Sequence, residues 1–183
     1  MNLQPDDWIR AAQLALRTQG LAGVRIETLA RDLGVSKGSF YWHFPNRAAL
    51  LEAIVGQWES KTAWLIAESR QASTAIERIR RLLLLIGTRA SPSGGDVDDA
   101  AMFLWARQDS QIAARVKAIE QQRIAYLQEL FVALGHAPTE AHLQAEFAYI
   151  AFVGYGERLE RVGEASIGFA DFCRLVLRLL DLE

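Results

Sequence analysis

A connection of only three residues, Gly34, Val35 and Ser36, separates two short stretches whose apolar residues recur at helical spacing. This short connection restricts the fold more than any other feature of the sequence. Gly34 is free to adopt a left-handed backbone conformation, and Ser36 is a suitable N-cap for the helix that follows. Two helices joined by so tight a turn must cross steeply. The segment is therefore predicted to form a helix-turn-helix unit, with helices over about 26–34 and 37–44.

Four large side chains, Tyr41, Trp42, His43 and Phe44, stand side by side near the end of the second of these helices. Successive helical residues point about 100° apart, so one buried face cannot hold them all. Phe40 and Phe44 share a face and are expected to anchor the helix on the core, while the other rings face a partner. Two alternatives stay open here: Tyr41 and Trp42 could pack under the next helix, and His43 could cap its own.

The rest of the chain is predicted to be helical as well, because it has only four prolines, its glycines fall mostly at segment ends, and it lacks a convincing alternating strand pattern. We expect an all-α protein of about nine helices with one clear loop, "SPSGGDVDD" at 91–99. The first helix should end at Gly20. Besides those above, the expected helices cover about 3–18, 47–69, 72–89, 100–107, 110–134, 138–161 and 167–182.

Charge is distributed unevenly along the 183 residues. The formal net charge is −2, but residues 1–50 carry six Lys and Arg against four acids. A mildly cationic N-terminal part on an acidic remainder suits a nucleic-acid binder. No apolar run is long enough to cross a bilayer and the N-terminus does not resemble a signal peptide, so we expect a soluble, cytoplasmic protein without membrane partners. The lone cysteine, Cys173, is expected to be a small core residue.

The segment "IETLARDLGVSKGSFYWHFPNRAALLEAI" closely resembles the DNA-binding domain of the tetracycline-repressor (TetR) family of bacterial regulators. The resemblance covers about residues 9–54 and is specific; beyond it, only the number and length of helices agree. It implies a DNA-binding domain at 1–46 and a helical ligand-binding and dimerisation domain at 47–183. It also implies a cytoplasmic homodimer, with no cofactor, that binds double-stranded DNA at a palindromic operator and is released by a small-molecule effector.

Transferred position by position, the resemblance also suggests which residues bind DNA. Lys37, Gly38 and Ser39 would lie at the leading end of the recognition helix over the major groove. Lys and Arg can neutralise phosphates, and Lys can donate to guanine O6 and N7. Glu27 would repel phosphates and is expected to point away. Arg25 replaces a hydroxyl residue that often caps the preceding helix. The full expected set is Arg25, Thr28, Lys37, Gly38, Ser39, Tyr41, Trp42, His43 and Arg47.

The C-terminal part offers weaker indications of a ligand site and a dimer interface. An aromatic and apolar cluster with one cation is the candidate ligand lining, although an ordinary core explains each apolar member better: Met102, Phe103, Trp105, Arg107, Tyr126, Tyr149 and Phe152. Arg107 would meet an anionic ligand or pair with Asp109 or Glu146. The last two long helices carry more apolar surface than one core needs, which indicates a four-helix dimer interface. Its expected residues are Phe147, Ala151, Gly154, Tyr155, Phe172, Leu175 and Leu179.

Catalytic and metal sites are not expected. His136 and His142 lie six residues apart and so on different helix faces, and His142 with Glu146 lacks further ligands. The sequence therefore favours a non-enzymatic regulator, most simply a repressor. Two rivals remain open: a DNA-binding regulator that needs no ligand, and a ligand-sequestering helical protein whose N-terminal domain no longer binds DNA.

Overall fold

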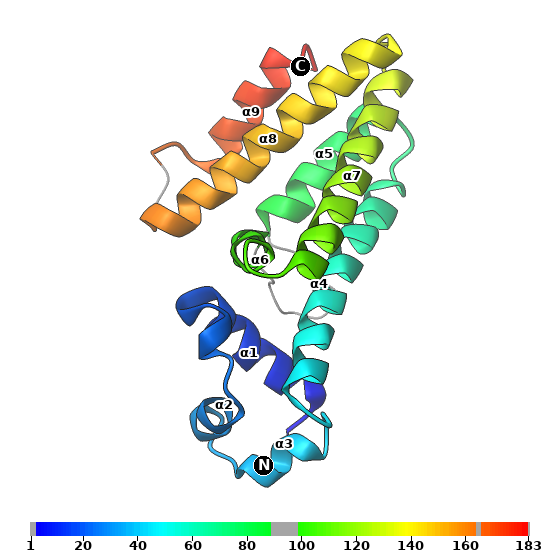
Figure 1. The fold of residues 1–183 in the computed structure, drawn as a ribbon. Coiled ribbons are helices and arrows are strands. Elements are labelled where there is room, and N and C mark those ends of the chain that lie inside the picture. Colours follow the sequence, from blue (N-terminus) through cyan, green and yellow to red (C-terminus); the bar gives the residue numbers. More distant parts are fainter. Residues whose placement is uncertain (1–2, 89–98, 164–165, 183) are drawn as a thin grey trace. The chain divides into compact units, whose positions relative to one another are not determined.

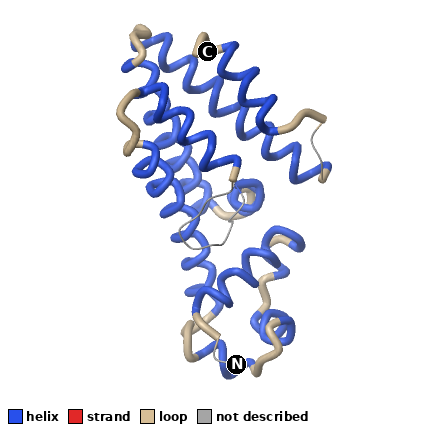
Figure 2. The backbone as a smooth tube through the Cα atoms, turned by 180° about the vertical axis from the view of Figure 1, so that it is seen from behind, coloured by secondary structure: helices blue, strands red, loops and turns tan. Residues whose placement is uncertain are grey.

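The computed structural model describes residues 3–88, 99–163 and 166–182. Within these residues every regular element is a helix, which confirms the all-α expectation (Figures 1 and 2). The elements are α1 (Pro5–Gln19), the 3-10 helix η1 (Leu21–Gly23), α2 (Ile26–Asp32), α3 (Lys37–Tyr41), α4 (Arg47–Ser69), α5 (Ala75–Gly87), α6 (Asp99–Ala106), α7 (Ser110–Ala133), α8 (Pro138–Val162) and α9 (Phe169–Leu179). The expected loop at 91–99 lies outside the described residues except for Asp99.

The chain divides into two compact units, each with its own packing. The first contains residues 1–61 and 91–114, so it holds α1, η1, α2, α3, α6, most of α4 and the start of α7. The second contains residues 62–90 and 115–183, with the end of α4, α5, most of α7, α8 and α9. The functional boundary expected between residues 46 and 47 stays a prediction.

Aromatic packing fixes α3 on the core of the first unit. The ring of Phe40 is fully buried and meets the buried ring of Trp8 edge-on, with centroids 5.2 Å apart. Phe44, also buried, stacks on Phe40 at 5.6 Å. The backbone N–H of Phe44 still donates to the carbonyl of Phe40, so the helical turn continues past the formal end of α3. The expectation that these two phenylalanines anchor the helix is confirmed.

The turn between α2 and α3 has the predicted backbone conformation. Gly34 has a φ of 69°, in the left-handed region where a side chain would be strained. Beside it, the N–H of Val35 donates to the carbonyl of Ala30 at 2.9 Å, which ties the turn back to α2. Ser36 occupies the N-cap position with an extended backbone, but its hydroxyl makes no capping hydrogen bond. The expected side-chain cap is therefore absent.

Residues after α1 form an element that was not expected. Gly20 ends α1 as predicted, with a φ of 69°, and its carbonyl accepts from the N–H of Gly23 at 3.0 Å, closing the short helix η1. A Cβ on Gly23 would lie 2.4 Å from the Gln19 Cβ, so this glycine is required by close packing. A three-residue turn leaves too little periodicity to be seen in the sequence.

The core of the second unit is built from α5, α7, α8 and α9. Phe172 of α9 packs among the rings of Phe152, Tyr155 and Phe169, with the Tyr155 ring stacked on it at 4.4 Å. Cys173 is buried beside it, which confirms the core assignment, and this burial raises the pKa of its thiol to about 11. Figures 1 and 2 both show α8 and α9 running side by side.

Candidate nucleic-acid interface

The outward surface of α3 carries large aromatic side chains that the chain itself does not cover. Trp42 is 88% exposed and Tyr41 is 52% exposed, whereas His43 is half-buried. The alternative in which Trp42 packs under α4 is therefore wrong. Exposing a tryptophan this fully gains nothing for folding, because the hydrophobic effect rewards only its burial. Such a ring at the end of a helix-turn-helix unit is available to a partner.

Lys37, the first residue of α3, forms an ion pair across the turn. Its Nζ donates to Oε1 of Glu27, in the first turn of α2, over 2.5 Å. This hydrogen bond lowers the pKa of the Glu27 carboxyl and raises the pKa of the Lys37 ammonium, so both groups stay charged around neutral pH. Glu27 was expected to point away from this surface, and that expectation is wrong. The long-range contact could not be found from local spacing.

Arg47, at the start of α4, has partners within the chain. Its Nε donates to the carbonyl of Val24 and its Nη2 to the carbonyl of Leu21, both at 2.6 Å. The side chain is half-buried and links α4 to the η1 turn. A phosphate contact by Arg47, as the family resemblance implies, would use the guanidinium donors left over from these two bonds. That role stays a prediction.

The remaining expected DNA-binding residues lie on α2 and α3. Arg25 is exposed at the N-cap of α2 and its side chain makes no capping bond, in agreement with the expected departure from the family pattern. Thr28 and Ser39 are half-buried. Gly38 is exposed, and a Cβ built on it would meet only the Ser36 hydroxyl oxygen, at 3.6 Å. Nothing within the described chain therefore requires a glycine there.

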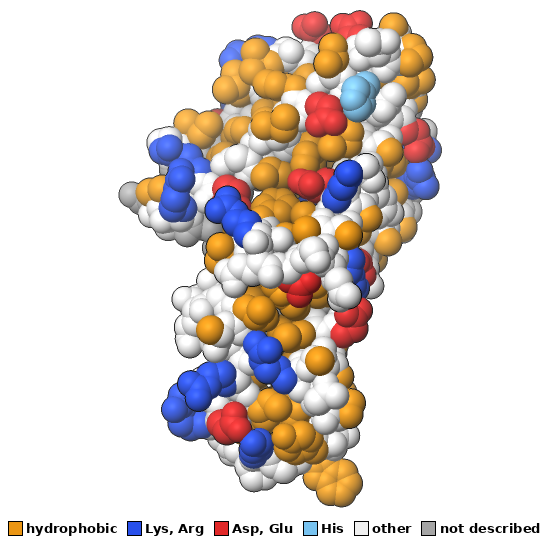
Figure 3. All heavy atoms as spheres, in the orientation of Figure 1, with side chains coloured by type: hydrophobic (Ala, Val, Ile, Leu, Met, Phe, Trp, Pro, Cys, Tyr) orange, Lys and Arg blue, Asp and Glu red, His pale blue; other side chains and the backbone are white. Residues whose placement is uncertain are grey.

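Figure 3 shows basic side chains gathered over the region of α2, with acidic side chains among them. Phosphate binding needs such a local excess of cations more than a high net charge. The surface around α2 and α3 thus combines cations, an exposed aromatic edge and a backbone open to close approach. This combination suits a nucleic-acid backbone and the base edges of its groove.

The residues expected to line a ligand site are divided between the two units. Met102, Phe103, Trp105 and Arg107 belong to α6 or directly follow it in the first unit; Tyr126, Tyr149 and Phe152 belong to the second. Met102 is fully buried and Arg107 is exposed. The carboxylate of Asp109, a suggested partner of Arg107, accepts from the N–H groups of Gln111 and Ile112 at the start of α7.

The two tyrosines of this set have hydrogen-bond partners within the second unit. The Tyr126 hydroxyl lies 2.7 Å from Ser69 Oγ, and the Tyr149 hydroxyl donates to Glu120 Oε1 at 3.0 Å. Phe152 packs against the core aromatic cluster. These contacts are those expected of ordinary core residues. A ligand role for the three residues stays a prediction.

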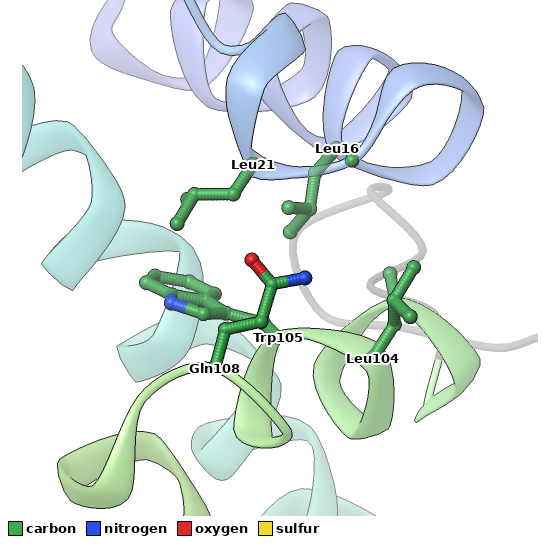
Figure 4. A pocket seen from close by; sticks show the side chains of 7 residues that line it. Leu16, Leu21, Leu104, Trp105 and Gln108 are labelled. Carbon is green, nitrogen blue, oxygen red and sulfur yellow. The ribbon is translucent and has the colours of Figure 1, made fainter.

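Trp105 lines a small cavity of about 30 Å³ in the first unit (Figure 4). Leu16 and Leu21 face Leu104, Trp105 and Gln108 across it. The indole N–H of Trp105 is buried and has no acceptor among the described residues. A cavity of this size holds a water molecule or two and is far below the roughly 300–1,000 Å³ of a drug-sized ligand pocket.

Apolar side chains remain exposed along α8 and α9 in the second unit. Leu143, Phe147 and Ile150 follow one another at helical spacing on α8, and Leu175 and Leu179 do so on α9. Figure 3 shows apolar side chains at the surface over these helices. Leu143 and Ile150 were missed by the sequence analysis, although their spacing from Phe147 could have indicated them.

Other members of the expected dimer interface differ in burial. Gly154 is exposed and Ala151 half-buried. Tyr155 donates its hydroxyl to the carbonyl of Ile167, and Phe172 is buried in the core of its own unit. Phe172 is therefore a core residue of its own unit and offers little surface to a partner.

The described ranges 3–88, 99–163 and 166–182 contain no group of three His, Cys, Asp or Glu side chains able to hold a metal ion. None of their helices is long and apolar enough to cross a membrane. His142 and Glu146 lie 3.9 Å apart as a surface pair on α8.

Comparison with known proteins matches part of this chain to a protein family and to individual relatives. The family described as "Bacterial regulatory proteins, tetR family" matches residues 9–54. The tetracycline repressor protein class A from transposon 1721 of Escherichia coli is 46% identical over 52 residues, which are 28% of this chain and 24% of that protein. The HTH-type transcriptional regulator TtgR of Pseudomonas putida is 31% identical over 80 residues, 43% of this chain and 38% of that protein. The matched regions thus span less than half of either relative.

The solved structures extend the likeness in fold to nearly the entire chain. A TetR transcriptional regulator from Legionella pneumophila superposes with a TM-score of 0.75 at 16% identity, covering 99% of this chain and 98% of that one. At this identity the superposition establishes a shared fold alone. The family match at residues 9–54 covers most of α1, then η1, α2, α3 and the start of α4.

Proposed function

We propose that this chain, whose residues 9–54 match the TetR family of bacterial regulatory proteins, is a member of that family and a DNA-binding transcriptional regulator that acts as a repressor. Some of the relatives that it matches are repressors or transcriptional regulators by name, and others are nucleoid occlusion factors SlmA. We propose no catalytic activity and no cofactor for this chain. A regulator of this kind works where the bacterial chromosome lies, so a cytoplasmic location is part of the proposal.

The exposed edge of α3 is the observation that carries the proposal. Phe40 and Phe44 hold the helix on the core, while Lys37, Tyr41 and Trp42 remain exposed. A rigid helix with a charged leading end and an aromatic edge fits the major groove, where side chains meet base edges and the groove walls. Arg25, Thr28, Ser39, His43 and Arg47 would add backbone contacts that set the register.

Two such helices must act together, because one has too few base contacts for useful specificity. We propose a two-fold dimer through α8 and α9, whose exposed apolar residues supply a self-complementary surface. Its core would contain Phe147, Ile150, Leu175 and Leu179. A two-fold dimer binds a palindrome with half-sites about one helical turn, roughly 34–36 Å, apart.

Release by a small molecule completes the proposal. The effector would be largely apolar, since the aromatic residues of the second unit offer mainly apolar contacts. It would bind one conformation of the dimer better than the other, and a difference on the order of 1–3 kcal/mol is enough to lower operator occupancy substantially. Within the second unit the candidate ligand residues remain Tyr126, Tyr149 and Phe152.

Selection of bound DNA from a random oligonucleotide pool tests DNA recognition directly. We expect the full-length protein to recover a palindrome, and to bind it at least 1,000-fold more tightly than random DNA at physiological salt, in the usual range for specific binders. If the protein selects no preferred sequence, the proposal of a DNA-binding regulator is excluded. The alternative, a helical protein that only sequesters a ligand, is then favoured.

Thermal melting against a panel of hydrophobic and cationic compounds tests release by an effector. A true effector raises the melting temperature and weakens operator binding in the same concentration range. If no compound raises the melting temperature, or if compounds that raise it leave operator binding unchanged, the result favours the regulator that needs no ligand. A compound that weakens operator binding only because it binds the DNA itself would not raise the melting temperature of the free protein.

A further inference from the structure

The ion pair between Glu27 and Lys37 spans the helix-turn-helix unit at the end where α3 begins. The two residues are ten positions apart, and their head groups lie 2.5 Å from each other. Both side chains remain accessible, 62% exposed for Glu27 and 49% for Lys37. The Lys37 ammonium, a donor, and the Glu27 carboxylate, an acceptor, therefore lie together on the surface that would face the major groove under the proposed function.

Stability alone gives little reason for this pair. Exposed ion pairs contribute little to folding, because water screens them and ordering long side chains costs entropy. On a surface that binds DNA, the carboxylate has a further cost, since it repels phosphates and cancels the charge of the lysine closest to the groove. A role in binding would offset this cost.

The edge of a G·C base pair matches the pair in chemistry and in spacing. In the major groove guanine presents two acceptors, O6 and N7, and cytosine presents a donor, the N4 amino group. Guanine O6 and cytosine N4 are joined by a base-pairing hydrogen bond, so they lie about 2.9 Å apart. A lysine ammonium beside a carboxylate presents the complementary order of donor and acceptor at a similar separation.

We propose that Glu27 is a specificity-determining residue, and that it reads one G·C base pair in each half-site together with Lys37. The Lys37 ammonium donates to guanine O6 and N7, and the Glu27 carboxylate accepts from cytosine N4. An A·T pair can offer adenine N6 to the carboxylate but only thymine O4 to the ammonium, in place of the two guanine acceptors. Where no amino group is presented the carboxylate only repels, so the pair also weakens non-specific binding. This inference rests on the proposed DNA-binding function.

The test compares full-length wild type with Glu27→Gln and with a matched control, Asp32→Asn. The control makes the same charge change on the same helix, at an exposed acid that pairs with the neighbouring Arg31. Each protein is used to select DNA from a random pool. Its affinity for the wild-type operator, for an operator with the G·C pair replaced, and for random DNA is then measured by fluorescence anisotropy at several salt concentrations.

We expect the wild type and the control to require one G·C pair per half-site that Glu27→Gln no longer requires. Discrimination at this position should fall by a factor of roughly 5–150, the range for a good base contact. Glu27→Gln should also bind random DNA more tightly and with a salt slope steeper by about one, because Lys37 is freed to neutralise one more phosphate. The melting temperatures of all three proteins should agree closely.

Two results would overturn the inference while leaving the proposed function intact. If Glu27→Gln binds every DNA more tightly by the same factor, the carboxylate only suppresses affinity. If it recovers the wild-type operator with unchanged affinities, the pair has no part in recognition. Failure of the wild type to select any sequence would instead refute the proposed function.

Discussion

Arg47 illustrates how a single side chain can have a second task that its sequence position does not indicate. Its two hydrogen bonds, to the carbonyls of Leu21 and Val24, satisfy backbone groups of the turn between α1 and α2. Hydrogen bonds to a charged donor contribute about 1.5–3 kcal/mol each, more than neutral ones. Arg47 therefore fixes the position of the helix-turn-helix unit on α4, whether or not it also contacts phosphate.

Arg47→Ala is predicted to lower the free energy of unfolding by about 2–4 kcal/mol, because it removes the side-chain donor to the part-buried Val24 carbonyl and the stronger of two donors to the Leu21 carbonyl. Urea denaturation followed by circular dichroism measures this loss. A variant at Arg25, which is exposed, should unfold like the wild type. Unchanged stability of Arg47→Ala, combined with a flatter salt dependence of DNA binding, would show that its contacts in the free chain are dispensable and that phosphate binding is its main role.

The helix α3 is only five residues long, too short to be stable by itself in water. It exists because Phe40 and Phe44 are packed against Trp8 and the neighbouring core. Its outward side is thus free to carry residues chosen for a partner, including a glycine that helix stability disfavours.

Truncating a side chain on the buried face of this helical turn is predicted to affect stability, whereas truncating one on the exposed face is predicted to affect DNA binding. Phe44→Ala removes a buried ring and should destabilise the N-terminal unit by roughly 3–5 kcal/mol. Trp42→Ala removes an exposed ring and should leave the melting temperature unchanged while weakening operator binding. A stable, folded Phe44→Ala that fails to bind DNA would contradict this assignment and make Phe44 a contact residue.

Gly38→Ala is predicted to stabilise the free protein slightly and to weaken its binding to DNA. Alanine is favoured over glycine inside a helix by about 0.5–1 kcal/mol, and the added methyl group meets only the Ser36 hydroxyl. If the groove approaches the α3 backbone here, that methyl group will clash with it. Calorimetry and operator titration measure the two effects, and unchanged affinity would show that DNA does not come close to Gly38.

The assembled protein depends on two compact units with different surfaces, one cationic and aromatic around α3 and the other apolar along α8 and α9. The exposed apolar residues on α8 and α9 are typical of an interface between copies of a chain. A stable interface of this type buries roughly 800 Å² on each partner, which two long helices can supply.

Ile150→Glu is predicted to convert the proposed dimer to a monomer, because it places a charge in the centre of the proposed α8 surface. Leu84→Glu is the matched control: Leu84 on α5 is 65% exposed and Ile150 is 64% exposed. Sedimentation velocity should show a monomer for the first and a dimer for the second, and only the first should lose tight operator binding. Two variants that both remain dimeric would exclude this face.

Local chemistry was sufficient to predict the α-helical segments, although not the short helix η1, and it also predicted the roles of Gly20 and Gly34 and which phenylalanines face inward. Periodicity and capping involve residues within a few positions of each other, so they can be read from the chain directly. The contact between Glu27 and Lys37, the partners of Arg47 and the separation of the ligand candidates into two units depend on residues brought together by packing. Side chains distant along the chain meet only once the helices have packed, so these features were decided by the tertiary structure.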